Sequence, residues 1–135
     1  MLWKNAYETG NAIVDGQHKE LFRLVQQVMD ADGFANRKEK IEAAMSFLSD
    51  YAVRHFTSEE RLMQRCSYPE FAEHKAQHNG FVKSVYAFVA RFEEEGDTIS
   101  ISETINNFVL AWLQGHIMVT DRLMAEYYKE WEASR

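Results

Sequence analysis

Five histidines and two carboxylates recur at positions that helical periodicity turns toward a core. They are His18, His55, Glu59, His74, His78, His116 and Asp121. His55 and Glu59 are four residues apart, so they lie one turn apart on the same face of a helix. His116 and Asp121 are five residues apart, and an ideal α-helix turns about 140° over that interval. We therefore expect these two to flank the face from its two sides.

A structural role is the ordinary explanation for a single histidine on an apolar face. If each histidine has roughly a 3/7 chance of facing the core, all five do so by luck about once in seventy. A glutamate is almost never fully buried without a partner. Burying such groups unpaired costs on the order of several kcal/mol. A metal ion satisfies imidazole and carboxylate together, whereas a metal-free bundle leaves them unexplained.

Seven side chains exceed what one ion needs. Two six-coordinate ions, a geometry suited to first-row transition metals, offer about twelve positions. The five histidines, two bridging carboxylates and a bridging oxygen fill about eleven of these, so about one stays open. An open position is typical of a ligand-binding or catalytic site. The ligand types leave iron, zinc, copper and nickel as candidates.

Four amphipathic segments must position these residues. Apolar residues at steps of three and four predict helices that begin near Asp15, Asn36, Pro69 and Ser100. Short connections make neighbouring helices antiparallel, so we expect an all-α, up-down-up-down four-helix bundle with a short N-terminal arm. The candidate ligands fall early, late, early and past the middle of successive helices, which places all of them near one end of the bundle.

The composition is that of an ordinary soluble domain, with 135 residues, 46% hydrophobic and 27% charged. We treat 1–135 as a single domain. The formal net charge of -6 argues against a nucleic-acid or anionic-membrane partner. The lone Cys66 allows no internal disulfide, lies off the face that carries the candidate ligands, and is expected to be a small packed or partly exposed thiol. Without a signal-like segment or an apolar run long enough for a bilayer, we expect a cytoplasmic protein.

Four motifs together resemble the hemerythrin family, specifically its single-domain bacterial members. They are D-G-Q-H-K with His18, H-F-x-x-E-E-x-x-M from His55, Y-P-x-F-x-x-H-x-x-x-H through His78, and W-L-x-x-H-I-x-x-x-D from Trp112 to Asp121. The resemblance implies a bridged non-haem di-iron site that binds O2 reversibly. It implies that His74, His78 and His116 hold one iron and that His18 and His55 hold the other. The two carboxylates would bridge, and the iron with two histidines would carry the open position.

Large apolar residues flank the candidate ligands, and we expect them to keep water away from bound O2. They are Leu21, Phe56, Met63, Trp112, Leu113 and Ile117. Plain core packing is the ordinary explanation for any one of them taken alone. By the resemblance, Trp112, Leu113 and Ile117 are similar to the lining of the O2 pocket.

The resemblance favours an O2 carrier, store or local supplier over an enzyme. In keeping with this, we see no further carboxylate or tyrosine placed beside the ligands as a proton donor. The alternative is a di-iron enzyme or sensor that uses the same site, such as a peroxidase, a nitric-oxide scavenger or an O2 or redox sensor. The expected partners are O2 and an oxygenase or a reductase, and we expect a monomer.

Overall fold

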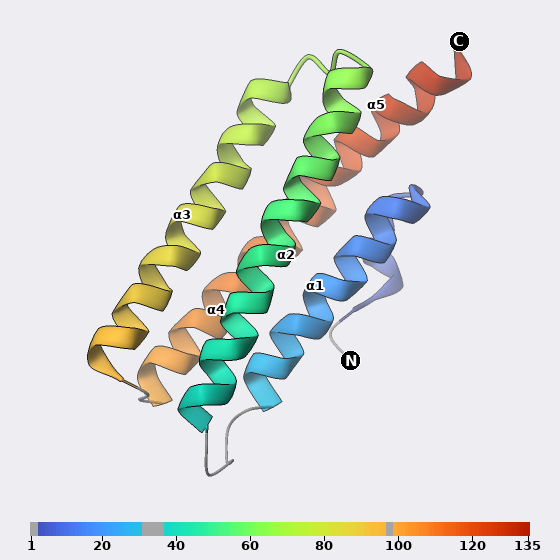
Figure 1. Cartoon of the computed structure of the whole chain (residues 1–135). Helices are drawn as coiled ribbons and strands as arrows, with labels where there is room; N and C mark the ends of the chain where they lie inside the picture. Colours follow the sequence, from blue (N-terminus) through green and yellow to red (C-terminus); the bar gives the residue numbers. More distant parts are fainter. Residues whose placement is uncertain (1–2, 31–36, 97–98) are drawn as a thin grey trace.

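The computed structural model describes residues 3–30, 37–96 and 99–135, and every regular element in these ranges is helical. The elements, in chain order, are the short 3-10 helix η1 (Asn5–Tyr7), α1 (Ala12–Asp30), α2 (Arg37–Arg65), α3 (Phe71–Glu95), α4 (Ile99–Gly115), the π-helical turn η2 (His116–Asp121) and α5 (Arg122–Ala133). The last three follow one another without a break and form one long fourth helix. We call α1, α2, α3 and this fourth helix the four columns of the bundle, and their arrangement can be followed in Figure 1.

Consecutive columns of the bundle run in opposite directions (Figure 1). α1 packs against α2 and α4, and α3 packs against the same two helices, so the columns close into a ring. The predicted up-down-up-down four-helix bundle is therefore confirmed. None of the described helices combines the length and the apolar character that a membrane span requires.

The N-terminal arm is a folded part of the bundle. Tyr7, at the end of η1, is buried, and its hydroxyl accepts a hydrogen bond from Nε2 of Gln114 at 3.1 Å. Its ring stacks on Phe22 of α1 with 5.1 Å between the ring centroids. The guanidinium of Arg122 donates to the backbone carbonyl of Ala6. The arm is thus fastened both to α1 and to the fourth column.

The core of the bundle consists of aliphatic and aromatic side chains from all four columns. Leu21, Leu48, Phe81 and Leu113 are each at most 1% exposed. Burying a side chain of this kind stabilises the fold by roughly 1.5–3 kcal/mol. A smaller cluster contains Val14, Met63 and Met124. Cys66 is buried and is not among the candidate ligands, as the sequence predicts.

The start of α1 differs from the prediction. The cap is Asn11, whose Oδ1 accepts hydrogen bonds from the N–H groups of Ile13 and Val14, both at 3.1 Å. Asp15, the predicted cap, lies in the first turn instead and accepts a hydrogen bond from the N–H of Thr9 at 2.8 Å. Both residue types favour this end of a helix, asparagine as the cap and aspartate as a charge beside the helix dipole.

The connection between α2 and α3 moves the start of α3. Ser67 has φ 54°, and the N–H of Tyr68 donates to the carbonyl of Met63 at 2.9 Å, the pattern of a Schellman motif. After this reversal α3 begins at Phe71. Pro69 therefore lies in the preceding turn and not in the first helical turn, where the sequence predicts it.

The other two predicted starts are Asn36 and Ser100. Asn36 lies outside the described residues, and α2 is described from Arg37. α4 begins at Ile99, one residue before the predicted cap, which is within the usual spread of helix boundaries.

Candidate metal centre

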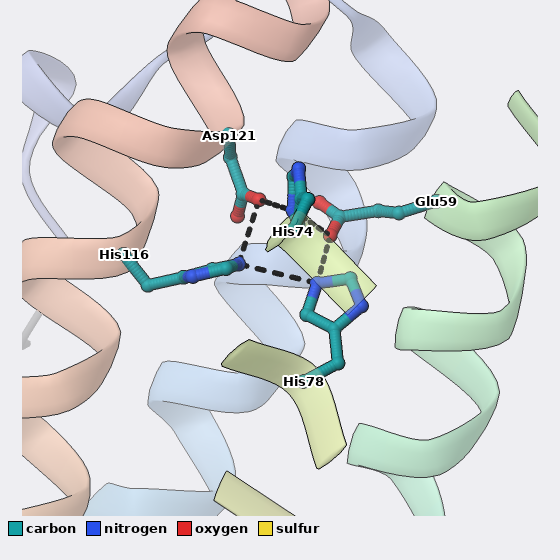
Figure 2. Close-up of side chains that lie close together, drawn as sticks. All are labelled: Glu59, His74, His78, His116 and Asp121. Atoms are coloured by element: carbon teal, nitrogen blue, oxygen red, sulfur yellow. Dashed lines mark hydrogen bonds and ion pairs between the residues drawn. The ribbon is translucent and has the colours of Figure 1, made fainter. Parts of the chain in front are cut away.

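The seven predicted ligands converge in the interior of the bundle. None is more than 5% exposed. α1 supplies His18, α2 supplies His55 and Glu59, α3 supplies His74 and His78, and η2 supplies His116 and Asp121. Figure 2 shows five of them with their polar ends directed toward one another. They lie early in α1 and α3 and late in α2, which is toward the end of the bundle where α2 connects to α3. The prediction that they gather near one end of the bundle agrees with this geometry.

The seven side chains form two groups that share their carboxylates. Ligand atoms of one group lie within 4.8 Å of one another and come from Glu59, His74, His78, His116 and Asp121. The other group meets the same limit and comprises His18, His55, Glu59 and Asp121. We call these the three-histidine group and the two-histidine group. Two shared carboxylates between two sets of imidazoles are the donor set that a pair of metal ions requires.

The turn η2 places His116 and Asp121 together, so the expectation that they flank the face from opposite sides is wrong. Nε2 of His116 lies 2.9 Å from Oδ1 of Asp121. An α-helix would separate these residues, but a π-helical turn bonds each N–H five residues back and widens the turn by one residue. Such turns are frequent at functional sites. The wider turn is what brings both side chains into the cluster.

Several buried atoms of the cluster have no hydrogen-bond partner. They include both ring nitrogens of His18, both carboxylate oxygens of Glu59, and Oδ2 of Asp121. Nε2 of His18 lies 2.9 Å from Oδ2 of Asp121, close enough for an ion pair, but the two atoms are not aligned for a hydrogen bond. Each buried polar atom left unpaired costs about 1–3 kcal/mol. A bound cation removes this cost, so the residues present fit a metal.

The histidine tautomers lead to the same conclusion. Nδ1 of His78 lies 2.8 Å from Oε2 of Glu60, and Nδ1 of His116 lies 2.8 Å from Oε1 of Gln77. Both oxygens are acceptors, so both Nδ1 atoms carry the hydrogen, and both Nε2 atoms of the neutral rings present lone pairs. These Nε2 atoms are 3.2 Å apart. Two lone pairs at this distance repel each other, and a cation bound by both removes the repulsion.

Three outer residues hold the ligands in place, and the sequence analysis missed them. They are Glu60 and Gln77, described above, and Gln17. Oε1 of Gln17 lies 2.7 Å from Nδ1 of His55. Its amide Nε2 donates to Oγ of Ser58 at 3.4 Å, which fixes Oε1 as the acceptor. Such contacts orient a metal-binding imidazole and raise its basicity. Each outer residue supports a ligand of the next column: Gln17 of α1 supports His55, Glu60 of α2 supports His78, and Gln77 of α3 supports His116.

The only signal in the sequence for these outer residues is adjacency. Gln17 precedes His18, Glu60 follows Glu59, and Gln77 precedes His78. None of them supports the ligand beside it, because neighbouring residues on a helix point about 100° apart. Their real partners are given only by the packing of one helix on the next.

The carboxylates and histidines of the cluster shift one another's pKa values in the absence of a metal. Burial lowers the pKa of His18 and His74, but the carboxylates of Asp121 and Glu59 outweigh burial and raise the pKa of both to about 9. Burial raises the pKa of the two carboxyls, yet the neighbouring histidines hold the pKa of both well below the usual range. Burial lowers the pKa of His116. The carboxylates are therefore ionised, and the protons on His18 and His74 are those that a cation would displace.

Aromatic rings cover the three-histidine group. Phe56 stacks on His78 with 4.0 Å between centroids and 8° between planes, and the half-buried Trp112 stacks on His116 at 4.3 Å and 14°. The other four residues predicted to keep the site dry are each at most 1% exposed: Leu21, Met63, Leu113 and Ile117.

Comparison with known proteins agrees with the motifs. The family model "Hemerythrin HHE cation binding domain" matches residues 9–128. The chain belongs to the hemerythrin family. A bacteriohemerythrin of Methylococcus capsulatus is 36% identical over 124 residues, which cover 91% of this chain and 92% of that protein. A bacteriohemerythrin of Clostridium acetobutylicum is 27% identical, covering 90% and 95%. The crystal structure of a wild-type hemerythrin superposes with a TM-score of 0.84 at 32% identity, covering 95% of this chain and 97% of that one.

Proposed function

We propose that this hemerythrin-family chain holds two iron ions in the buried cluster and binds O2 reversibly. The observation that carries the proposal is the pair of ligand groups with shared carboxylates and unpaired buried donor atoms. Membership of the hemerythrin family and the similarity to bacteriohemerythrins support iron over the other metals that imidazole and carboxylate accept. When bound, an iron pair supplies two electrons and an open coordination position for O2.

The two groups suggest how the ligands divide. His74, His78 and His116 would hold one ion, and His18 and His55 would hold the other. Glu59 and Asp121, which belong to both groups, would bridge them. The group with fewer side chains is the one that leaves a position for O2, which supports the assignment expected from the sequence.

The apolar shell supports carriage over oxygen activation. Leu21, Leu113 and Ile117 are buried. Exclusion of water slows the proton transfers that accompany irreversible oxidation of an oxygenated site. Trp112, although half-buried, extends this shell over His116. Within the described ranges, the ligand groups contain no carboxylate besides the two shared ones. The side chain of Glu60 engages the outer nitrogen of His78 instead. We propose that the protein acts as an O2 carrier, store or supplier, as a monomer in the cytoplasm.

The test is iron content followed by visible spectra in three states: reduced without O2, reduced with O2, and after O2 removal. We expect two irons per chain and a visible band that appears with O2 and disappears when O2 is removed. Irons that oxidise irreversibly without an oxygenated form would overturn reversible carriage. Turnover of H2O2 or NO far faster than autoxidation would instead establish the enzyme alternative.

A further inference from the structure

The buried position of the cluster raises the question of how a metal ion enters it. All seven ligands are at most 5% exposed, so an ion must pass through a layer of side chains. Among the surface cavities formed by the described residues, there are some that reach a ligand of the three-histidine group. One is lined in part by His78 and another in part by His74. Their chemistry differs, and the difference indicates which one admits a cation.

The cavity at His78 is poorly suited to a cation. It has a volume of about 430 Å3 and lies between α2 and α3, with Val53, Val82 and Tyr86 among its lining residues. Lys83 contributes a positive charge to the same lining. The outer nitrogen of His78 is already engaged by Glu60. Glu60 also lines this cavity, but its carboxylate is the one that engages His78. A hydrated divalent ion on this path would therefore meet apolar side chains, an ammonium group and a carboxylate that already has a partner.

The cavity at His74 differs from the first in its charged groups, although Val119 and Leu123 give it apolar walls as well. It has a volume of about 320 Å3 and lies between the start of α3 and the segment that joins η2 to α5. Its lining includes the exposed carboxylates of Glu70 and Glu73 and the polar side chains of Gln77 and Thr120. Carboxylate and amide oxygens are ligands that replace the water shell of a divalent ion.

The His74 ring spans the wall between this cavity and the cluster. His74 is 1% exposed, and its Nδ1 has no hydrogen-bond partner. Its Nε2, on the other side of the ring, lies 3.0 Å from Oδ1 of Asp121. One imidazole therefore offers an unused nitrogen outside the cluster while its second nitrogen belongs to the cluster.

The described residues that line this cavity include two carboxylates and no lysine or arginine. Burial first, and then the carboxylates of Glu70, Asp121 and Glu73 together with Cys66, raise the pKa of Tyr68, another lining residue. The carboxylates of Glu70 and Glu73 thus act on the space beside Tyr68, and carboxylates that line a cleft raise the local concentration of cations.

We propose that the cavity lined by Glu70, Glu73 and His74 is the entry path for divalent metal. The two carboxylates capture the hydrated ion, and the His74 imidazole is the first nitrogen ligand that replaces water on the way to the cluster. The step is ligand exchange: the ion releases water, the His74 ring releases to solvent the proton that it holds in the metal-free cluster, and no electron is transferred. This inference rests on the metal cluster of the proposed function and is independent of O2 binding.

Helix stabilisation is the competing explanation for these carboxylates. Glu70 is the N-cap residue of α3 and Glu73 lies in its first turn, where negative charge favourably meets the helix dipole. A purely structural role predicts an effect on the unfolding temperature and none on the rate of metal uptake. The two explanations are therefore separable by kinetics.

The experiment compares two charge-matched double variants, E70Q/E73Q and E93Q/E94Q. Glu93 and Glu94 are exposed on the same helix, and twenty residues from Glu73 correspond to about 30 Å. Co2+ is the probe because its visible spectrum reports binding. Uptake is followed after chelator treatment, with circular dichroism recorded to confirm that the metal-free chain is helical. A second measurement starts from the loaded protein and follows release to a chelator.

For E70Q/E73Q we expect uptake and release both about tenfold slower than in the wild type at low salt. Both rates change together because the cluster that sets the affinity is untouched. E93Q/E94Q should keep the wild-type rates, and all three proteins should bind two ions. Equal rates in all three proteins, or equal slowing of both variants, would overturn the entry path while leaving the cluster intact. A wild type that binds no Co2+ would overturn both the path and the proposed metal centre.

Discussion

The two halves of the cluster are built differently. In the three-histidine group, the Nδ1 atoms of His78 and His116 are held by outer side chains, and aromatic rings stack on both imidazoles. In the two-histidine group, only His55 has such an outer partner. The rings of His18 and His55 meet edge to face at 4.7 Å, and Nδ1 of His18 has no partner. The imidazoles of the three-histidine group are therefore held in place by more contacts than those of the two-histidine group.

This difference suggests a division of labour. In the three-histidine group, outer side chains hold two of the three imidazoles, and only Nδ1 of His74 lacks a partner. Such support fixes the position of an ion through the rigidity of its surroundings. A set with fewer protein ligands leaves coordination capacity for an external molecule. The shared carboxylates belong to both halves, so iron ions held there would together supply the electrons for an external ligand.

The largest effect is expected from Glu59→Gln, which removes a charge shared by both groups. We expect metal affinity to fall by more than about 100-fold for both ions, because a bridging ligand is lost as well as its charge. Elemental analysis after dialysis measures the change. His18→Ala is the matched control and should empty mainly the two-histidine group. Retention of two ions by Glu59→Gln would contradict the shared-carboxylate arrangement.

A smaller effect should separate the two halves. Gln77→Leu leaves Nδ1 of His116 without its acceptor, and Gln17→Leu does the same to His55. Each change should weaken one ion by about 10–100-fold, and a different ion in each case. Competition with a graded series of chelators measures this, and Gln77→Glu should restore affinity because an acceptor returns. Identical losses from both variants would show that the halves are not independent.

The apolar shell is tested by Leu113→Ala. The leucine is 1% exposed, so its truncation should cost about 2–5 kcal/mol of folding stability and admit water near the cluster. We expect the oxygenated form to autoxidise several-fold faster, as followed by the decay of its visible band. Leu48→Ala, equally buried, is the control for lost stability alone. An autoxidation rate unchanged from the wild type would remove Leu113 from the proposed barrier to water.

The smallest effect concerns the helix that carries His18. Asn11→Ala removes the cap of α1 and should lower the unfolding free energy by about 1 kcal/mol, because two N–H groups lose their acceptor. Thermal unfolding of the loaded protein checks this. Metal stoichiometry should not change, since the cap lies almost two turns before His18. A loss of one ion would mean that metal binding by the two-histidine group requires an intact first turn of α1.

The sequence by itself determined the architecture and the ligand set. Apolar residues at steps of three and four are a local consequence of helix geometry, so four amphipathic segments could be recognised without coordinates. Histidine and glutamate on apolar faces conflict with burial unless a metal binds them, and this conflict is visible in the sequence alone. His55 and Glu59 were predicted as a pair for this reason, and the structure brings their Nε2 and Oε2 atoms to 3.3 Å.

Only the tertiary structure decided the pairing of His116 with Asp121 and the choice of outer partners. A π-helical turn is a small local alternative to an α-helical turn, and no single residue type specifies it, so the spacing of five suggested opposite sides. Gln17, Glu60 and Gln77 each support a histidine on another helix, 38, 18 and 39 residues away along the chain. Such contacts depend on the rotation and height of one packed helix relative to the next, and a periodic pattern within one helix carries no information about either quantity.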